Sequence, residues 1–171
     1  MQKRAAIYAG SFDPFTNGHH EIVLRGLELF DELVILVAVS NTKKALFSME
    51  ERVTMIKELY QSEARIKVDS SQGLLVDYAR DHQIGFILRG LRPTGDFDYE
   101  FHMASMNYEL NPQVETTFFI TRKDHSCVSS TAIREIIACG GDCTKFVPSV
   151  IFSYLESNLQ KNLQKRGQLC T

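Results

Sequence analysis

Short runs of β-forming residues alternate with longer stretches of helical periodicity along this 171-residue chain, and this alternation constrains the fold more than any other feature. It is typical of a parallel sheet wrapped by helical crossovers. The run at 33–39, Leu-Val-Ile-Leu-Val-Ala-Val, is apolar throughout, as in a strand buried on both faces. Strands are expected at 5–9, 33–39, 65–68, 86–88 and 114–120, and helices at 18–30, 48–60, 74–82, 97–110, 130–138 and 148–159.

Five strands joined by helical crossovers predict a single α/β domain over residues 1–171, doubly wound and Rossmann-like, with a C-terminal helix and a frayed tail over about 160–171. The segment Ser48-Met-Glu-Glu51 fits a capping box at the start of the second helix. The usual strand order for this pattern is 3-2-1-4-5, with the first and fourth strands at the centre of the sheet. Ligands bind where the winding direction reverses. The loops after strands one, four and five are therefore expected to frame the functional site.

The charge balance excludes some classes of function. With 19 Lys and Arg residues against 21 Asp and Glu residues, the formal net charge is −2, which argues against a broad basic face for nucleic acid. No apolar run reaches the ~18 residues of a membrane span, and no signal-peptide core follows Met1, so we expect a cytoplasmic protein with no membrane partner. The four cysteines are expected to be reduced thiols, and Cys139 and Cys143 lack the second Cys/His pair of a zinc site.

The loop after the first strand reads Gly10-Ser-Phe-Asp-Pro-Phe-Thr-Asn-Gly-His19. Backbone N–H groups and the positive end of the helix dipole would meet the His19 imidazole here, which suits an anion. The segment fits neither a phosphate-binding P-loop, nor a dinucleotide fingerprint, nor a nucleophile elbow. A plain turn with a solvated His19 remains the alternative. His20 points about 100° away from His19 on the helix and is interpreted as structural or exposed.

Two arginines follow the fourth strand in the segment Leu88-Arg-Gly-Leu-Arg92. Guanidinium groups donate to phosphate bidentately and keep their charge, so Arg89 and Arg92 suit a phosphate. The following segment, Asp96-Phe-Asp-Tyr-Glu100, offers acidic partners with which one or both arginines could pair instead.

Two further segments carry phosphate-binding groups to the same edge of the sheet. Lys43 and Lys44 follow the second strand, although an exposed lysine pair is usually just solvated. After the fifth strand, Val128-Ser-Ser-Thr-Ala-Ile-Arg134 places hydroxyls and free amides at a helix start, which again suits an anion. The alternative is a plain serine N-cap. Because several loops offer such groups together, the sequence predicts a site for more than one phosphate.

These segments together resemble the bacterial phosphopantetheine adenylyltransferases, a family of the nucleotidylyltransferase superfamily, from the first strand to about Leu155. The segment Thr16-x-Gly-His19 is similar to the superfamily's His-x-Gly-His motif with threonine in the first position. The other segments that carry the resemblance are Lys43-Lys-Ala-Leu-Phe-Ser-Met-Glu-Glu-Arg52, Leu88-Arg-Gly-Leu-Arg92, Asp96-Phe-Asp-Tyr-Glu100 and Ser129-Ser-Thr-x-x-Arg134.

The resemblance implies reversible transfer of AMP from ATP to 4′-phosphopantetheine, which gives dephospho-coenzyme A and pyrophosphate in the penultimate step of coenzyme A synthesis. It also implies a homo-hexamer, Mg²⁺ carried mainly by the ATP phosphates, and feedback inhibition by coenzyme A. The implied catalytic residues are His19, Lys43 and Arg92, and the implied contacts to the acceptor substrate come from Ser11, Lys43, Leu75 and Arg89. The implied ATP site comprises Ser11, Phe12, His19, Gly90, Leu91, Arg92, Glu100, His125, Ser126, Cys127, Val128, Ser129, Ser130 and Thr131.

Such a reaction needs positioning and charge more than acid or base groups. The nucleophile is already a phosphate anion and the leaving group is pyrophosphate, so no side chain must remove a proton. His19 is expected to donate to the α-phosphate oxygens, while Lys43 and Arg92 offset the repulsion between two anionic reactants.

The chain departs from the family pattern at two places, and rival functions remain. His125 stands where Trp or Tyr is common, although its ring can still stack on adenine, and Phe15 replaces a smaller aliphatic residue. Superfamily members that act on nicotinate mononucleotide or on glycerol 3-phosphate usually carry His at the position of Thr16. A non-catalytic nucleotide-binding regulator on the same fold is a further alternative, which the joint presence of His19, Lys43 and Arg92 disfavours.

Overall fold

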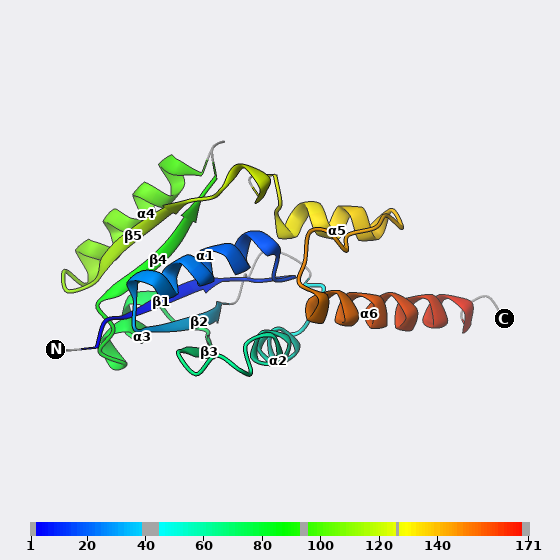
Figure 1. Ribbon diagram of the computed structural model, residues 1–171, viewed down its shortest axis with the longest axis horizontal. Helices are drawn as coiled ribbons and strands as arrows, with labels where there is room; N and C mark the ends of the chain where they lie inside the picture. Colours follow the sequence, from blue (N-terminus) through cyan, green and yellow to red (C-terminus); the bar gives the residue numbers. More distant parts are fainter. Residues whose placement is uncertain (1–2, 39–44, 93–95, 126, 169–171) are drawn as a thin grey trace.

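The computed structural model describes residues 3–38, 45–92, 96–125 and 127–168 (Figure 1). Five parallel strands form one sheet in the order β3-β2-β1-β4-β5, which confirms the expected fold and strand order. The strands are β1 (Ala5–Gly10), β2 (Glu32–Ala38), β3 (Ile66–Ser71), β4 (Phe86–Leu91) and β5 (Glu115–Ile120).

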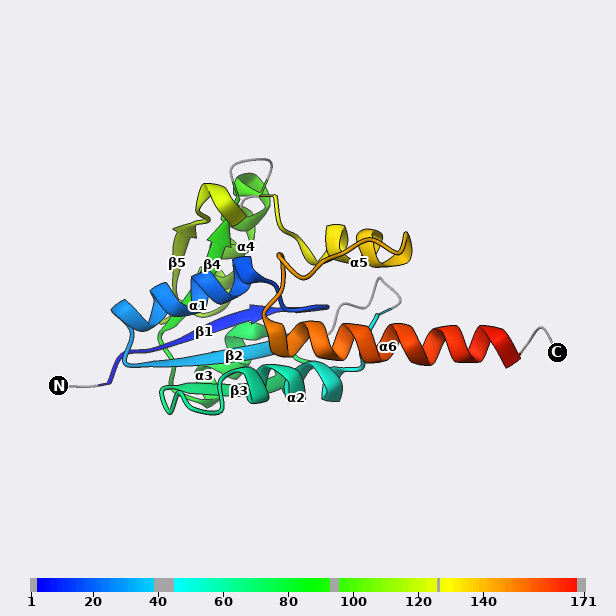
Figure 2. The same ribbon diagram turned by 45° about the vertical axis from the view of Figure 1, so that its right-hand side comes forward.

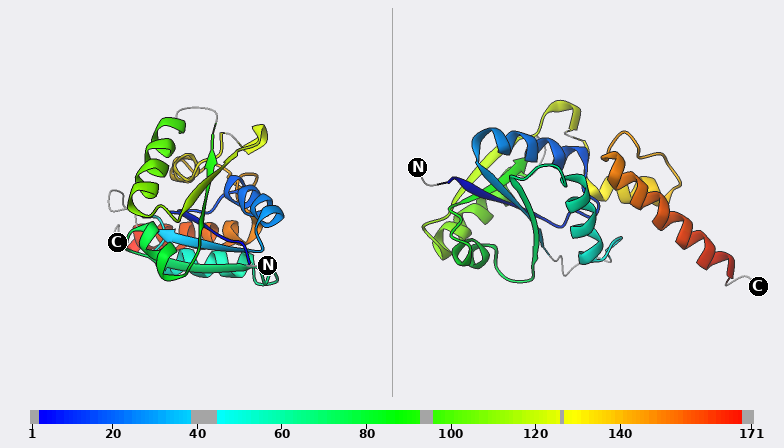
Figure 3. Two further views of the ribbon diagram at one scale, coloured as in Figure 1. Left: turned by 90° about the vertical axis from the view of Figure 1, so that its left-hand side faces the viewer. Right: turned by 60° about the horizontal axis from the view of Figure 1, so that its bottom comes forward.

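Helices cover both faces of the sheet, as the view along it shows for α1 and α4 on either side of β4 and β5 (Figure 3, left). The helices are α1 (Asn17–Leu29), α2 (Met49–Leu59), α3 (Leu75–Asp81), α4 (Phe97–Leu110), α5 (Ser130–Ala138) and α6 (Ser149–Gln168), with a short 3₁₀ turn η1 (Lys123–His125). No helix within the described residues is long and apolar enough to cross a bilayer.

Two hydrophobic clusters form the core, one on each face of the sheet. Successive residues of a strand point to opposite faces, so Ala6 and Tyr8 join the larger cluster while Ile7 and Ala9 join the smaller one. The larger cluster packs β1 and β2 against α1, α2, α5 and α6, and the smaller one includes Ala79 of α3. As predicted, β2 is buried along nearly its whole length. Helices α5 and α6 lie beyond the carboxyl end of β1 (Figure 2).

The ends of several elements differ from the predicted ones. Helix α6 continues past Leu159, the predicted end, to Gln168, so the expected frayed tail is helical over most of its length. Strand β4 continues past Leu88 to Leu91, because Arg89 to Leu91 still pair with β5. The capping box at Ser48 is confirmed: its hydroxyl accepts the Glu51 N–H and the Glu51 carboxylate accepts the Ser48 N–H.

The central strands separate at the carboxyl edge of the sheet. Strand β1 pairs with β4 only as far as Tyr8 and Leu88, whereas β1 continues to Gly10 and β4 continues to Leu91. The opening created there is the reversal point at which a ligand is expected.

The described cysteines are free thiols, as expected. Cys127 and Cys139 are exposed and Cys143 is buried, while Cys170 lies outside the described residues.

Candidate active site

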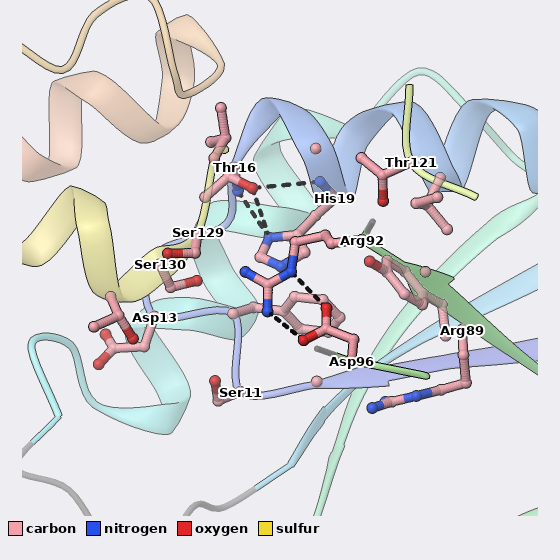
Figure 4. A pocket seen from close by; sticks show the side chains of 18 of the residues that line it. Ser11, Asp13, Thr16, His19, Arg89, Arg92, Asp96, Thr121, Ser129 and Ser130 are labelled. Carbon is pink, nitrogen blue, oxygen red and sulfur yellow. Dashed lines mark hydrogen bonds and ion pairs between the residues drawn. The ribbon is translucent and has the colours of Figure 1, made fainter. Parts of the chain in front are cut away.

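A cavity of about 810 Å³ lies where β1 and β4 separate, and the loop after β1, the end of β4 and the start of α5 all contribute to its wall (Figure 4). Predicted site residues that line it are Ser11, Phe12, His19, Arg89, Gly90, Arg92, Glu100, Val128, Ser129, Ser130 and Thr131. Leu75, Leu91 and Cys127 are not among the lining residues. Lys43, Lys44, Ser126 and the side chain of His125 lie outside the part of the chain that the structure describes.

The His19 ring is held by reciprocal hydrogen bonds at the start of α1. Thr16 is the N-cap, and its hydroxyl accepts the His19 backbone N–H at 3.4 Å. In return, the Thr16 backbone N–H donates to His19 Nδ1 at 3.0 Å. Because Nδ1 accepts this bond, a neutral ring carries its proton on Nε2. The Phe12 and Phe15 rings pack against the imidazole, with centroids at 5.1 and 5.3 Å.

His19 is a neutral hydrogen-bond donor in this cavity. Its pKa is lowered from the ordinary value of 6.5 to about 3, chiefly because the ring is buried and also because of the positive charges of Arg92 and Arg89. In Figure 4 the Arg92 guanidinium reaches across the cavity toward the His19 ring. The imidazole and the guanidinium therefore face one shared hollow.

Both arginines of β4 and its following turn pair with acidic residues, which is the alternative that the sequence left open. Arg89 donates from Nε to Glu100 at 2.6 Å and from a terminal nitrogen to the Ala9 carbonyl at 2.7 Å. Arg92 makes a two-pronged pair with Asp96, at 2.6 and 3.1 Å. A phosphate that binds Arg92 must therefore compete with the Asp96 carboxylate.

Helix α5 is bonded directly to the loop after β1. The Ser130 hydroxyl donates to the Pro14 carbonyl at 2.9 Å, and Arg134 donates to the Asp13 carbonyl at 2.7 Å. Ser129 is also a plain N-cap, since its side chain accepts the Ala132 N–H at 3.1 Å. Ser129 therefore has both of the roles that the sequence suggested, because it caps α5 and also lines the cavity.

Sequence reasoning missed two buried polar residues that shape the cavity, Asp13 and Arg52. The Asp13 carboxylate accepts the Leu46 and Phe47 N–H groups at 2.8 and 3.0 Å, and so ties the loop after β1 to the segment before α2. Arg52 of α2 donates to the Ser11 carbonyl at 2.6 Å. Both lie in segments quoted above, but their partners are 33 to 41 positions away, so spacing gave no signal.

Comparison with known proteins agrees with this geometry. Residues 7–136 match the model of the cytidylyltransferase-like family. The chain is 46% identical over 159 residues to a phosphopantetheine adenylyltransferase of Coxiella burnetii (strain RSA 493 / Nine Mile phase I), covering 93% of this chain and 99% of the relative. The chain belongs to the phosphopantetheine adenylyltransferase family.

Two further phosphopantetheine adenylyltransferases are nearly as similar. The protein of Syntrophotalea carbinolica is 45% identical over 157 residues, or 92% of this chain and 95% of the relative. The protein of Anaeromyxobacter sp. (strain K) is 46% identical over 156 residues, or 91% and 95%. Membership of the phosphopantetheine adenylyltransferase family confirms the resemblance that the sequence segments indicated, and it disfavours the two superfamily rivals.

Proposed function

We propose that this protein transfers the adenylyl group of ATP to 4′-phosphopantetheine, in the penultimate step of coenzyme A synthesis. The named relatives support this proposal, since each is called a phosphopantetheine adenylyltransferase. The observation that carries it is the placing of a neutral imidazole donor and the arginines Arg89 and Arg92 around one cavity. A neutral hydrogen-bond donor and two positive charges suit a site in which two phosphorylated reactants bind side by side.

The reaction joins two phosphates without a side-chain base. An oxygen of the acceptor phosphate attacks the α-phosphorus of ATP, and the bond from that phosphorus to the bridging oxygen breaks. The products are dephospho-coenzyme A and pyrophosphate. The Nε2–H of His19 donates to an α-phosphate oxygen as charge grows there, while Arg92, released from Asp96, offsets the charge of the phosphates.

The residues divide between the two reactants. ATP lies against Phe12, the turn Gly90 to Arg92 and the segment 128–131 at the start of α5, with Glu100 and 125–127 completing its site. The acceptor lies against Ser11 and Arg89, with Lys43 and Leu75 as its further predicted contacts. Ser11 and His19 also contact the nucleotide phosphates.

Mg²⁺ is part of the proposal as a companion of the nucleotide. The described residues hold no group of three His, Cys, Asp or Glu side chains that could bind a metal alone. The cavity carboxylates Asp13, Asp96 and Glu100 are each paired with an arginine. These residues fit an ion that arrives on the ATP phosphates, where it supplies positive charge to the departing pyrophosphate.

Assembly, regulation and location follow the family expectation. We propose a homo-hexamer that works in the cytoplasm and is inhibited by coenzyme A. Support for assembly comes from α4, where Phe101 is 53% and Met106 58% exposed. Large apolar side chains gathered at this level of exposure are typical of a protein interface.

Pyrophosphate release tests the proposal. The protein is incubated with ATP, Mg²⁺ and, separately, 4′-phosphopantetheine, nicotinate mononucleotide or glycerol 3-phosphate. We expect release with 4′-phosphopantetheine alone. Release only with nicotinate mononucleotide would contradict 4′-phosphopantetheine as the acceptor. No release with any acceptor would favour a non-catalytic nucleotide-binding protein.

A further inference from the structure

Arg52 is a buried guanidinium at the cavity that the mechanism above leaves without a role. It lies in the second turn of α2, is 6% exposed, and lines the cavity together with Ser11 and Ala45. Its hydrogen-bond partners are carbonyl oxygens: Nε donates to Ser48 at 3.2 Å and a terminal nitrogen donates to Ser11 at 2.6 Å.

The charge of Arg52 is not balanced by a carboxylate. The other arginines that line the cavity are paired, Arg89 with Glu100, Arg92 with Asp96 and Arg134 with Asp13. Among the arginines whose side chains the structure describes, Arg52 alone has no carboxylate oxygen within 4.0 Å. Burying a cation without a counter-ion is costly, so an anion in the cavity gains more from Arg52 than from a paired arginine.

The position of Arg52 distinguishes between the two anionic reactants. In the view of Figure 4, Ser11 and Arg89 lie below His19 and Arg92, Thr16 lies above them, and Ser129 lies beside them. Arg52 is bonded to Ser11, and it is therefore on the Ser11 side. The start of α5, where the nucleotide is proposed to lie, is beside His19 and Arg92 in this view.

We propose that Arg52 is a positioning residue for the phosphate of the acceptor, 4′-phosphopantetheine. Its hydrogen bond fixes the Ser11 backbone, and its unbalanced charge attracts the acceptor phosphate at short range. This role depends on the proposed function, and it adds Arg52 to the residues that bind the acceptor. Because Arg52 donates to Ser11, a proposed contact of the acceptor, and makes its other hydrogen bond to Ser48, its charge should act more on the acceptor phosphate than on the nucleotide.

Binding measurements on a matched set of ligands and variants test this role. Isothermal titration with 4′-phosphopantetheine, with pantetheine, which lacks the phosphate, and with ATP gives the dissociation constants of the wild type, Arg52→Gln and Arg52→Lys. The control is Arg65→Gln, because Arg65 also donates to a carbonyl, that of Leu27, but does not line the cavity. Circular dichroism and thermal melting show whether each variant is folded.

We expect Arg52→Gln to weaken binding of 4′-phosphopantetheine by about tenfold or more, and binding of pantetheine and ATP by less than about threefold. The KM for 4′-phosphopantetheine should rise with little change in kcat. Arg52→Lys keeps the charge and should recover part of the loss, and Arg65→Gln should behave as wild type. A general structural role would instead weaken all three ligands alike.

An unchanged ratio of the two acceptor affinities in Arg52→Gln overturns the role, as does a loss of ATP affinity equal to that of 4′-phosphopantetheine. If the glutamine variant does not fold, the lysine variant decides: a loss confined to the phosphorylated acceptor supports the role, and an equal loss or no loss overturns it. A wild-type protein that binds no 4′-phosphopantetheine would overturn the proposed function itself, which is a different result.

Discussion

A single backbone hydrogen bond determines which nitrogen of His19 carries the proton. The Thr16 N–H donates to Nδ1, so Nε2 is left to donate into the cavity. Threonine also accepts the His19 N–H through its hydroxyl, which makes the first turn of α1 a reciprocal cap. Thr16 therefore caps α1 and also determines which nitrogen of His19 is protonated.

Replacing His19 should slow the chemical step more than it weakens binding. His19→Ala removes a donor that is most useful when charge develops on the α-phosphate, and we expect kcat to fall about 10²- to 10³-fold. The affinity for 4′-phosphopantetheine should change little. Steady-state pyrophosphate release checks both values, and normal turnover in this variant would refute the role given to the imidazole.

The His19 ring should stay neutral across the range in which free histidine titrates. Its pKa in the folded protein is lowered to about 3 from 6.5, so between these values the unfolded chain binds a proton that the folded chain does not. The contribution of His19 to stability therefore falls as the pH decreases through that window. Nitrogen chemical shifts of the ring, followed by NMR between about pH 5 and 8, should show the Nε2–H form throughout.

The Arg92–Asp96 pair should compete with ATP. Asp96 is the N-cap residue of α4 but its side chain makes no cap hydrogen bond, because it is bonded to Arg92. Asp96→Asn removes the competing charge, and we expect about two- to tenfold tighter ATP binding by titration calorimetry. Asp98→Asn is the control, since Asp98 is exposed on the same turn. Weaker binding in Asp96→Asn would show that the carboxylate serves the nucleotide directly.

The sequence predicted where the site lies better than how its charges pair. The carboxyl ends of parallel strands meet at one edge, so Arg89, Arg92 and His19 could be assigned to one place from strand order alone. The pairing with Glu100 and Asp96 stayed open, because several acidic residues lay within reach. Arg52 has its partner 41 positions away, and no short-range pattern reports such a contact.

At the scale of elements, the start of α2 holds the buried charge of Arg52. Ser48 caps this helix, and its carbonyl accepts the Arg52 Nε–H. The helix begins directly after the segment that Asp13 anchors through the Leu46 and Phe47 N–H groups. A local capping signal in the sequence therefore fixes a side chain that reaches another loop.

Removing this cap should destabilise the fold by a modest amount. Ser48→Ala leaves the Glu51 N–H without its acceptor, and we expect a loss of about 1 kcal/mol in the free energy of unfolding. Urea unfolding at one fixed protein concentration measures it. Ser153→Ala is the control, because its hydroxyl only bonds back to a carbonyl within α6, and it should change stability by less than about 0.5 kcal/mol.

The presence of each strand and helix could be predicted from the sequence, but the residues at which some of them end could not. All strands and helices that the periodicity indicated are present. Strand β4 continues beyond Leu88 because it still pairs with β5 where it no longer pairs with β1. The end of β4 therefore depends on β5, which is distant in the sequence. Helix α6 runs to Gln168 through a polar stretch in which periodicity gave no boundary.

At the scale of the whole molecule, α4 presents apolar side chains that the described chain does not cover. Glu100 is buried against the domain, whereas Phe101, Met106 and Leu110 are each more than half exposed. Ile120, at the end of β5, is 70% exposed. This distribution supports contact with another subunit along the α4 side of the sheet.

Adding a charge to this surface should disrupt the assembly. Met106→Lys places an ammonium group in a contact that the proposed hexamer buries, and we expect sedimentation velocity to show smaller species. Ser62→Lys is the control, because it adds the same charge to a polar, exposed position between α2 and β3, at the opposite edge of the sheet from β5. A wild-type protein that sediments as a monomer would contradict the proposed hexamer.

The bond between Asp13 and Arg134 joins positions 121 residues apart, and the cavity needs both ends of that span. During translation the first strands leave the ribosome long before α5 does. Nucleotide therefore cannot act as a template for early folding of the nascent polypeptide. The growing chain must assemble its sheet unaided, and only the nearly finished polypeptide can capture ATP.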